Sequence, residues 1–433
     1  MRIVRICAVI VYVVIGFVLN APAADPVPAP LRVHDPALIQ DGEWSYVFAT
    51  GRGVPIRRSR DLVAWEQVGT VFPDNVPGWA ARAIPGARDL WAPDISWWAG
   101  EYRLYYSVST FGSQRSAIGL ATNKALDPSN PAYRWVDRGL VVDSVPARDD
   151  FNAIDPNVLP DDPDDIARDP NRPRIWLTFG SFWGGIQVVG IDAETGKPDP
   201  ARWGPPRTIA ARPGDHAIEA PFLYRKGGWY YLFASTDHCC RGVNSDYKVV
   251  VGRSRRADGP YVDLDGRPMT EGGGTTVIAS SGTTRGPGHN AVARLADGSE
   301  VFVHHYYDAA DRGMPKLQVR CLAWGADGFP LAGEVRRGAR EDGAGRPAAP
   351  DPGSLRRRWD VSVDFAEPRP IRLLDGGGIE GDRPGAHWSL AGRTLRLDWG
   401  GGRVGECVVA PDGRSFVGRD AGHEVIRGTA RDD

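Results

Sequence analysis

The stretch Asn152-Ala153-Ile154-Asp155-Pro156-Asn157 is one of five short polar motifs that recur along the chain at a nearly constant interval. The other four centre on Asp35, Asp94, Glu219 and His289. Successive motifs are separated by 59, 61, 64 and 70 residues. Each motif is followed by an aromatic and β-branched run, such as Tyr102 to Ser109, which is typical of a buried strand.

Further strand-like segments follow within each unit, among them Ile118 to Thr122 and Lys248 to Gly252. About four strands per roughly 60 residues, repeated five times without a long helical pattern, predict an all-β fold with a five-bladed β-propeller. Equivalent positions on successive blades converge on one axis, so we expect the five motif side chains to meet around a central pocket. The alternative is that these residues only cap turns and strand starts.

The first residues have the order of a secretory signal peptide, with basic residues, an apolar run from Ile6 to Leu19 and small residues near Ala23. The fourteen apolar residues span about 21 Å as a helix, which is shorter than the roughly 30 Å hydrocarbon core of a bilayer. We therefore expect residues 1–23 to be removed and the mature protein to be secreted, extracellular or periplasmic. We expect it to act as a monomer without a membrane partner.

The rest of the chain divides into a propeller over residues 30–335, a linker over 336–355 and a small β domain over 356–433. The linker is rich in Gly, Pro, Ala and charged residues, which is typical of a connecting segment. After it, short strand-like runs are divided by Gly turns. This small domain either binds polysaccharide or supports the propeller.

The charge of the chain bears on its partners, and its cysteines bear on possible disulfides. A formal net charge of −2 and the absence of a basic stripe argue against nucleic acid. Four cysteines remain after the signal peptide: Cys239, Cys240, Cys321 and Cys407. They allow three pairings, and the adjacent Cys239 and Cys240 form either a vicinal disulfide or two thiols.

Three acidic residues in one pocket of a secreted protein suggest glycoside hydrolysis, in which one carboxyl group protonates the leaving oxygen and another activates water or attacks carbon. Glu219 lies among apolar neighbours, which should raise its pKa and keep it protonated. Asp35 lies beside His34 and should stay ionised. Asp155, one blade before Glu219, should raise the pKa of Glu219 by repulsion. The alternative for all three is chelation of Ca²⁺.

Longer motifs resemble the endo-α-1,5-L-arabinanases of glycoside hydrolase family 43 over about residues 32 to 330. They are His34-Asp35-Pro36, Leu90 to Ile95, Ser109 to Ser113, Ala117 to Ala121, Asn152 to Asn157, Phe179 to Ile186, Gly214 to Phe222 and Gly286 to Asn290. The resemblance implies a five-bladed propeller that cleaves arabinan with inversion. Asp35 would be the general base, Glu219 the general acid, and Asp155 the residue that orients the acid.

The resemblance also implies residues for the sugar and for an ion. The implied substrate contacts are Trp91, Phe111, Gly112, Asn152, Ser181 and Trp183. His289 matches a histidine that holds a calcium ion in the central channel, largely through water, or else it is only hydrogen-bonded within the fifth blade. His304 and His305 alternate across a strand and are interpreted as residues of the sheet.

Two rival functions stay open at this point. An exo-acting arabinanase, arabinofuranosidase or xylosidase of the same family would share the fold and the acidic residues. A non-catalytic carbohydrate-binding propeller would share only the fold. Hydrolysis that depends on Glu219 and Asp35 would exclude the second rival, and early products would separate internal from terminal cleavage.

Overall fold

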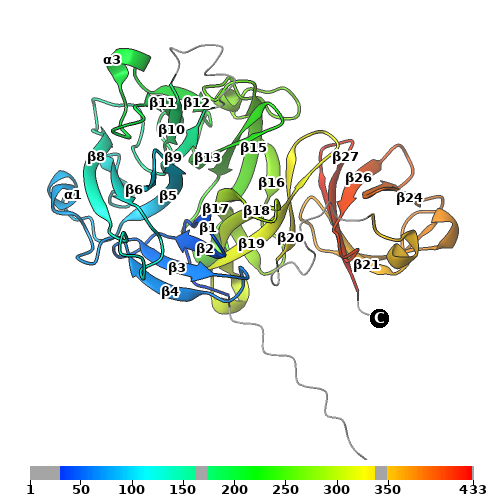
Figure 1. Cartoon of the computed structure of the whole chain (residues 1–433). Helices are drawn as coiled ribbons and strands as arrows, with labels where there is room; N and C mark the ends of the chain where they lie inside the picture. The colour runs from blue at the N-terminus through cyan, green and yellow to red at the C-terminus, as the bar shows by residue number, and fades with distance from the viewer. Residues whose placement is uncertain (1–29, 162–172, 337–348, 432–433) are drawn as a thin grey trace, which may run out of the picture.

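The computed structural model describes residues 30–161, 173–336 and 349–431, and it consists almost entirely of strands (Figure 1). Five four-stranded antiparallel sheets follow one another in chain order, and an eight-stranded sheet follows at the C-terminus. The predicted five-bladed propeller with a small C-terminal β domain is therefore confirmed. The predicted signal peptide and residues 337–348 of the predicted linker lie outside the described residues. Within the described ranges, no helix is long and apolar enough to cross a membrane.

Each blade is built from four consecutive strands. Blade one has β1 (Ala37–Asp41), β2 (Trp44–Phe48), β3 (Pro55–Ser59) and β4 (Glu66–Thr70). Blade two has β5 (Trp91–Trp98), β6 (Glu101–Val108), β7 (Ser116–Asn123) and β8 (Val136–Ser144). Blade three has β9 (Asn157–Pro160), β10 (Ile175–Phe179), β11 (Ile186–Ile191) and β12 (Arg207–Ala210). Blade four has β13 (Ile218–Lys226), β14 (Trp229–Thr236), β15 (Lys248–Ser254) and β16 (Thr275–Ile278). Blade five has β17 (Thr284–Arg294), β18 (Glu300–Asp308), β19 (Met314–Trp324) and β20 (Pro330–Val335).

The helices of the propeller are short. Those in the described residues are α1 (Gly78–Ala83), α3 (Pro200–Trp203) and the 3₁₀ turns η1 (Gly242–Asn244), η2 (Met269–Glu271) and η3 (Ala309–Asp311). Most of the second and third strands are buried over much of their length, as in β7, where every residue is buried, whereas β3 and β19 are largely half-buried. Sheets that pack on both faces need continuous apolar runs, which explains why these segments do not alternate in polarity.

The first strand of each blade is the innermost, and these five strands form a ring. β1 contacts β5, β5 contacts β9, β9 contacts β13, β13 contacts β17, and β17 contacts β1 again. Among the described strands, none is exchanged between the first and the last blade, because each of these sheets consists of its own four consecutive strands. The ring therefore closes by side-chain packing and a few hydrogen bonds rather than by a shared sheet.

The junction between blades five and one contains both hydrogen bonds and apolar side-chain packing. The N–H of Leu317 donates to the carbonyl of Leu31 (2.8 Å), and the N–H of Ala296 donates to Oε1 of Gln40 (2.7 Å). Apolar residues of the two blades, including Leu38 and Val303, belong to one buried cluster. The segment just before β1 is thus fixed against blade five, and this segment carries Asp35.

One residue in or just before each inner strand has left-handed backbone geometry. These residues are Asp35 (φ 50°), Ala92 (φ 44°), Asp155 (φ 58°), Ala220 (φ 53°) and His289 (φ 49°). Left-handed geometry is uncommon for residues other than glycine and is often found at functional sites. Its recurrence in all five blades shows that it is the common structural position of the repeat.

The N–H groups of these residues hold the blades together. Those of Ala92, Asp155 and His289 donate to hydroxyl groups of the preceding blade, namely Thr50 (2.8 Å), Ser107 (2.9 Å) and Ser235 (2.9 Å). The N–H of Asp35 donates to Nδ1 of His305 (3.2 Å), which closes the series across the junction between blades five and one. Only the junction between blades three and four differs, since the N–H of Ala220 donates to the carboxylate of Asp155 (3.1 Å).

The expectation that Asp94 lies in the central pocket is wrong. Ala92 occupies the common left-handed position of blade two, so Asp94 lies two residues further along β5 and is buried. Its Oδ1 accepts from Nδ2 of Asn157 (3.1 Å) and its Oδ2 from the N–H of Val158 (2.9 Å). Burial raises the pKa of Asp94 to about 6, although both hydrogen bonds oppose the shift. Asp94 therefore joins blades two and three instead of facing the pocket.

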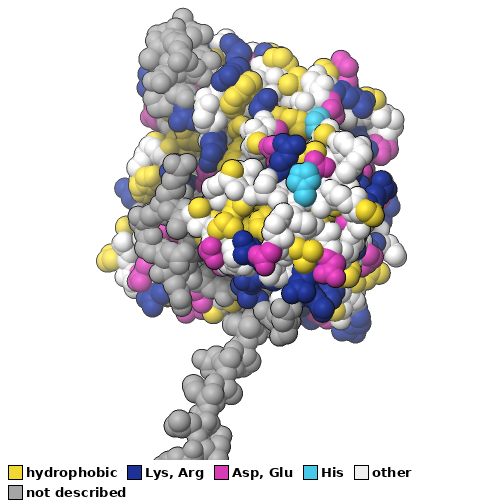
Figure 2. Space-filling view, turned by 90° about the vertical axis from the view of Figure 1, so that its right-hand side faces the viewer, with side chains coloured by type: hydrophobic (Ala, Val, Ile, Leu, Met, Phe, Trp, Pro, Cys, Tyr) yellow, Lys and Arg dark blue, Asp and Glu magenta, His cyan; other side chains and the backbone are white. Residues whose placement is uncertain are grey.

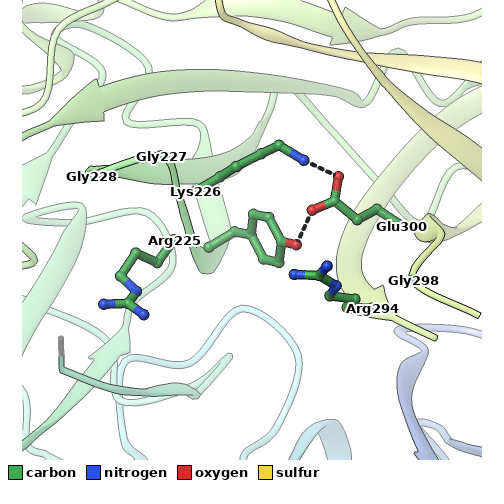
Figure 3. A pocket seen from close by; sticks show the side chains of 8 residues that line it. Arg225, Lys226, Gly227, Gly228, Arg294, Gly298 and Glu300 are labelled. Atoms are coloured by element: carbon green, nitrogen blue, oxygen red, sulfur yellow. Dashed lines mark hydrogen bonds and ion pairs between the residues drawn. The ribbon is translucent and has the colours of Figure 1, made fainter. Parts of the chain in front are cut away.

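At the opposite end of β13, a polar network joins blades four and five (Figure 3). Glu300 accepts from the hydroxyl of Tyr224 (2.5 Å) and from Nε1 of Trp324 (2.8 Å), and it forms an ion pair with Lys226. A cavity of about 370 Å³ lies beside this network. Glu219 is the second residue of β13 and Lys226 the last, so the two lie about 23 Å apart along the strand.

The C-terminal domain is a single eight-stranded antiparallel sheet in the order β23-β22-β21-β28-β27-β26-β25-β24. Its strands are β21 (Arg358–Val363), β22 (Arg369–Leu373), β23 (Ile379–Glu380), β24 (His387–Ala391), β25 (Thr394–Asp398), β26 (Val404–Val409), β27 (Ser415–Asp420) and β28 (Val425–Ala430), with the turns η4 (Pro352–Leu355) and η5 (Asp375–Gly377). The two edges meet, since the N–H of Ile379 donates to the carbonyl of Ala386 (3.1 Å). The sheet thus curls around a core that contains Trp359 and Leu397.

This domain packs against blades four and five (Figure 1). Arg419 of β27 is buried, forms an ion pair with Asp327 (3.1 Å) and donates to the carbonyl of Pro330 (2.8 Å). Val417 and Phe365 belong to the same apolar cluster as residues of blades four and five. The face turned away from the propeller has acidic and basic side chains interspersed with hydrophobic ones (Figure 2).

Replacing Asp94 by Ala should destabilise the propeller, because it leaves the N–H of Val158 and the amide of Asn157 buried without their acceptor. We expect the free energy of unfolding in urea to fall by about 2–4 kcal/mol. Asp74→Ala, at an exposed position, is the control and should stay within about 0.5 kcal/mol of the parent. Equal stability of the two variants would contradict the role of Asp94.

Candidate active site

A cavity of about 1140 Å³ lies at the end of the propeller where the inner strands begin. Asp35, Asp155, Glu219 and His289 all line it, although they come from four different blades. All five inner strands have the same direction in their blades, so their first residues meet at one end of the ring. None of the described residues of the C-terminal domain lines this cavity.

Asp35 is surrounded by imidazole rings. Its Oδ1 lies 2.8 Å from Nδ1 of His34, 3.2 Å from Nδ1 of His289 and 3.5 Å from Nδ1 of His305. Its Oδ2 accepts from the hydroxyl of Thr50 (2.5 Å). Burial by itself would raise the pKa of Asp35, but the three histidines and the hydrogen bond from His34 together hold that pKa well below its usual range. Asp35 is therefore a carboxylate at any working pH.

The hydrogen bonds identify which ring nitrogens carry protons. Nδ1 of His305 accepts from the N–H of Asp35, so it has no proton of its own, and burial lowers the pKa of His305 well below 6.5. Nδ1 of His34 lies at hydrogen-bond distance from a carboxylate and therefore donates. Burial works against the charged form of His34, but Asp35 raises its pKa above 6.5. The other nitrogen, Nε2, is 2.7 Å from the hydroxyl of Tyr307.

Glu219 has the opposite environment. Burial is the largest influence and raises its pKa, and the negative charge of Asp35 acts in the same direction. The hydroxyl of Ser181 donates to Oε2 of Glu219 (2.7 Å) and lowers the pKa in part. Ser181 lies just after β10, at the one blade junction where the N–H of the left-handed residue donates to a carboxylate and not to a hydroxyl group or a ring nitrogen. Its hydroxyl orients Glu219 instead.

Asp155 connects the two other carboxyl groups. Its Oδ2 accepts from the N–H of Ala220, the residue after Glu219. Burial raises the pKa of Asp155 well above its usual value, and the charges of Glu219 and Asp35 raise it further. Asp155 and Glu219 therefore compete for one proton, while Asp35 stays charged. This division of proton affinity allows one carboxyl to act as an acid and another as a base.

The six residues expected to contact the substrate all line the same cavity: Trp91, Phe111, Gly112, Asn152, Ser181 and Trp183. The side chain of Phe111 is 84% exposed, which is unusual for a large apolar residue and places it at the rim. Such a ring can pack against a sugar without first being released from the core. Oδ1 of Asn152 is buried and has no hydrogen-bond partner among the described residues.

The residues present do not form a direct calcium site. Within the described ranges, the one group of three side chains with ligand atoms close together is His34, Asp35 and His305, which offers a single carboxylate. Ca²⁺ requires six to eight oxygen ligands, so imidazole rings fit it poorly. Both amide atoms of Asn290, the neighbour of His289, are buried and unpartnered in the described part of the chain. Buried polar atoms of this kind usually bind water, which fits an ion held only through water.

Sequence reasoning missed several residues of the site. His305 is indeed in β18, as expected, but it also accepts a hydrogen bond from Asp35. Tyr307 lies two residues further on the same strand face, and Thr50 follows the strand β2. The spacing of two residues between His305 and Tyr307 was a usable signal, because alternate residues of a strand share a face. Cys239 and Cys240 line the cavity as a vicinal disulfide.

A propeller that gathers three carboxyl groups with divided proton affinities in one large cavity has the site of a glycoside hydrolase. The comparison with known families agrees. The model of the glycosyl hydrolases family 43 matches residues 25–330, and the chain belongs to this family. It is therefore an enzyme that hydrolyses glycosidic bonds.

Named relatives include both modes of cleavage. A protein of Cellvibrio japonicus, named extracellular exo-alpha-(1->5)-L-arabinofuranosidase ArbA, is 42% identical over 314 residues, which cover 70% of this chain and 86% of the relative. A protein of Bacillus subtilis, named extracellular endo-alpha-(1->5)-L-arabinanase 1, is 40% identical over 303 residues, which cover 69% and 87%. The crystal structure of an endo-1,5-alpha-L-arabinanase from Thermotoga petrophila has a TM-score of 0.74 at 23% identity and covers 94% of this chain and 100% of that one. This last likeness shows a shared fold that extends into the C-terminal domain.

Two substitutions should move the basic limb of the pH profile of kcat/KM in opposite directions. Asp155→Asn removes a negative charge beside Glu219, lowers the pKa of the remaining acid and should shift the limb to lower pH. Ser181→Ala removes a hydrogen bond that favours the carboxylate of Glu219, so its pKa rises and the limb should shift to higher pH. Shifts in the same direction, or no shift in either variant, would contradict this account of Glu219.

Proposed function

We propose that this enzyme cleaves internal α-1,5-L-arabinofuranosyl linkages of arabinan and inverts the configuration at the anomeric carbon. The observation that carries the proposal is the division of the three carboxyl groups into an ionised Asp35 and a pair with raised pKa values, Asp155 and Glu219, in one cavity. The names of the Cellvibrio and Bacillus relatives support arabinan as the substrate.

The proposed reaction assigns one step to each carboxyl group. Glu219 donates its proton to the oxygen of the leaving sugar as the glycosidic bond breaks. Asp35 accepts a proton from a water molecule as the water oxygen bonds to the anomeric carbon on the opposite face. His34, His289 and Thr50 hold the Asp35 carboxylate in place. Asp155 keeps the proton of the acid from dissociating before substrate binds, and Ser181 fixes the direction of Glu219.

The size of the cavity supports an oligosaccharide segment as the ligand. Pockets for single small molecules are typically about 300–1000 Å³, whereas this cavity is about 1140 Å³. Its rim presents Phe111, Trp91 and Trp183, whose flat faces can pack on successive furanose rings. The exo-acting alternative is supported by the name of the Cellvibrio relative and by a solved structure of an exo-1,5-alpha-L-arabinanase from a bovine ruminal metagenomic library, which is 42% identical.

We also propose that the enzyme is a secreted monomer with a water-held calcium ion beside His289. The order of basic, apolar and small residues before Ala24 supports secretion, as do the names of the extracellular relatives. The vicinal disulfide supports it too, because disulfides persist mainly in oxidising compartments. The proposed chemistry does not pass through the ion.

Early products from linear, debranched arabinan test the proposal. We expect a ladder of oligosaccharides from the first minutes, because internal bonds would be cut. Glu219→Gln and Asp35→Asn should each lower turnover by about 10²–10⁴-fold while the fold is retained. Glu367→Gln, on the exposed surface of the C-terminal domain, is the matched control and should be unchanged. Arabinose alone at early times would contradict internal cleavage, and full activity of Glu219→Gln would contradict the mechanism.

A further inference from the structure

The vicinal disulfide Cys239–Cys240 lies in the wall of the catalytic cavity. It follows β14 and precedes η1, and both cysteines line the cavity together with Asp35 and Glu219. Cys240 is exposed, has left-handed geometry (φ 66°) and can be reached by a reagent in solution. Nothing in the proposed reaction requires a disulfide here.

Hydrogen bonds connect this disulfide to Asp35. The N–H of Cys240 donates to the hydroxyl oxygen of Tyr307 (2.7 Å). That hydroxyl lies 2.7 Å from Nε2 of His34, whose Nδ1 lies 2.8 Å from Oδ1 of Asp35. Sγ of Cys240 lies 3.7 Å from the Tyr307 hydroxyl and 3.9 Å from Nε2 of His34, so the sulfur packs against the same two groups. One peptide N–H and three side chains thus form a continuous series from Cys240 to Asp35.

The direction of the Cys240 N–H depends on the disulfide. A bond between adjacent side chains closes a small ring that includes the peptide between them, and the ring limits how this peptide can rotate. Without the bond, only the ordinary loop contacts would hold Cys240 in its left-handed geometry, which is unfavourable for a residue with a side chain. The N–H could then turn away from Tyr307, and His34 would lose its fixed partner on Nε2.

We propose that the Cys239–Cys240 disulfide is a positioning element for Asp35, acting through Tyr307 and His34, and that its reduction by a dithiol lowers activity. This inference rests on the proposed function of Asp35. It assigns no contact with the reacting atoms to the cysteines. Its physical basis is that His34 is the nearest of the three imidazoles to the Asp35 carboxylate.

The redox step is a thiol–disulfide exchange. One thiolate of the dithiol attacks a cysteine sulfur, breaks the S–S bond and forms a mixed disulfide with that cysteine. The second thiolate of the dithiol then attacks the reagent sulfur of the mixed disulfide, and the cysteine leaves as a thiolate. The two cysteines gain two electrons and two protons and become thiols, while the dithiol becomes a cyclic disulfide. The bond on which the reagent acts in the wall of the cavity is Cys239–Cys240.

The test compares the pH profile of kcat/KM for oxidised enzyme and for enzyme kept in dithiothreitol, with linear arabinan as substrate. When Tyr307 no longer fixes Nε2 of His34, the contact between Nδ1 of His34 and the Asp35 carboxylate weakens. The pKa of Asp35 then rises, and the acidic limb should move to higher pH. We expect kcat/KM on this limb to fall by about tenfold to a hundredfold and to recover on reoxidation. Circular dichroism should show an unchanged fold.

Two neighbouring tyrosines provide matched variants. Tyr307→Phe keeps the ring but removes the hydroxyl, so it should shift the acidic limb as reduction does and should no longer respond to dithiothreitol. Tyr306→Phe changes the adjacent residue, which lies on the other face of β18, and should behave like the parent in both redox states. A response of Tyr307→Phe equal to that of the parent would overturn the pathway through Tyr307.

Failure of this inference differs from failure of the proposed function. If oxidised enzyme hydrolyses arabinan and reduction leaves its pH profile unchanged, the positioning role is overturned while the proposed function stands. If reduction lowers activity without moving the acidic limb, the disulfide acts on something other than Asp35, and the inference is again overturned. If oxidised enzyme hydrolyses no arabinan, the proposed function itself fails.

Discussion

The site depends on one constraint: five inner strands must close into a ring, and each must have a residue in left-handed geometry within it or just before it. In four blades the N–H of this residue donates to a side chain in the second strand of the preceding blade or two residues after that strand. These bonds fix both the order of the blades and the height of each residue along the axis. Asp35 and Asp155 occupy this position themselves, and Glu219 precedes it by one residue.

In the described part of the chain, the one junction without this hydrogen bond, between blades three and four, is the junction that holds the proposed acid Glu219. Between blades three and four, the N–H of Ala220 donates to a carboxylate instead of a hydroxyl, and Ser181 donates to Glu219. The side chain that accepts the N–H at the other blade junctions is here replaced by the carboxylate of Asp155. Asp155 and Ser181 both influence the pKa of Glu219. All three carboxyls are buried, which alone would raise every pKa, so the histidines around Asp35 decide which of them stays charged.

Much of this architecture could be predicted from the sequence, because the repeat of polar motif and aromatic strand specifies blades of similar length. The placement of Asp94 could not, since the motif register is set by left-handed geometry at Ala92 and not by the acidic residue. The environment of Asp35 was also hidden, because His305 lies 270 residues away and meets it only when the ring closes. The resemblance to family 43 identified the cavity residues that spacing alone left undecided. The spacing of His305 and Tyr307 places both on one strand face, but no pattern connected Tyr307 to His34 or decided the state of Cys239 and Cys240.

The central claim is that Asp35 activates a water molecule while Glu219 protonates the leaving oxygen from across the same cavity. Proton nuclear magnetic resonance of the first products tests it most directly, because an attacking water must reach the anomeric carbon from the face opposite the leaving group. The account predicts that the new reducing ends appear first as the β anomer and that the α anomer grows only by later mutarotation. Initial formation of the α anomer would show that a carboxylate attacks carbon, and it would contradict the role given to Asp35.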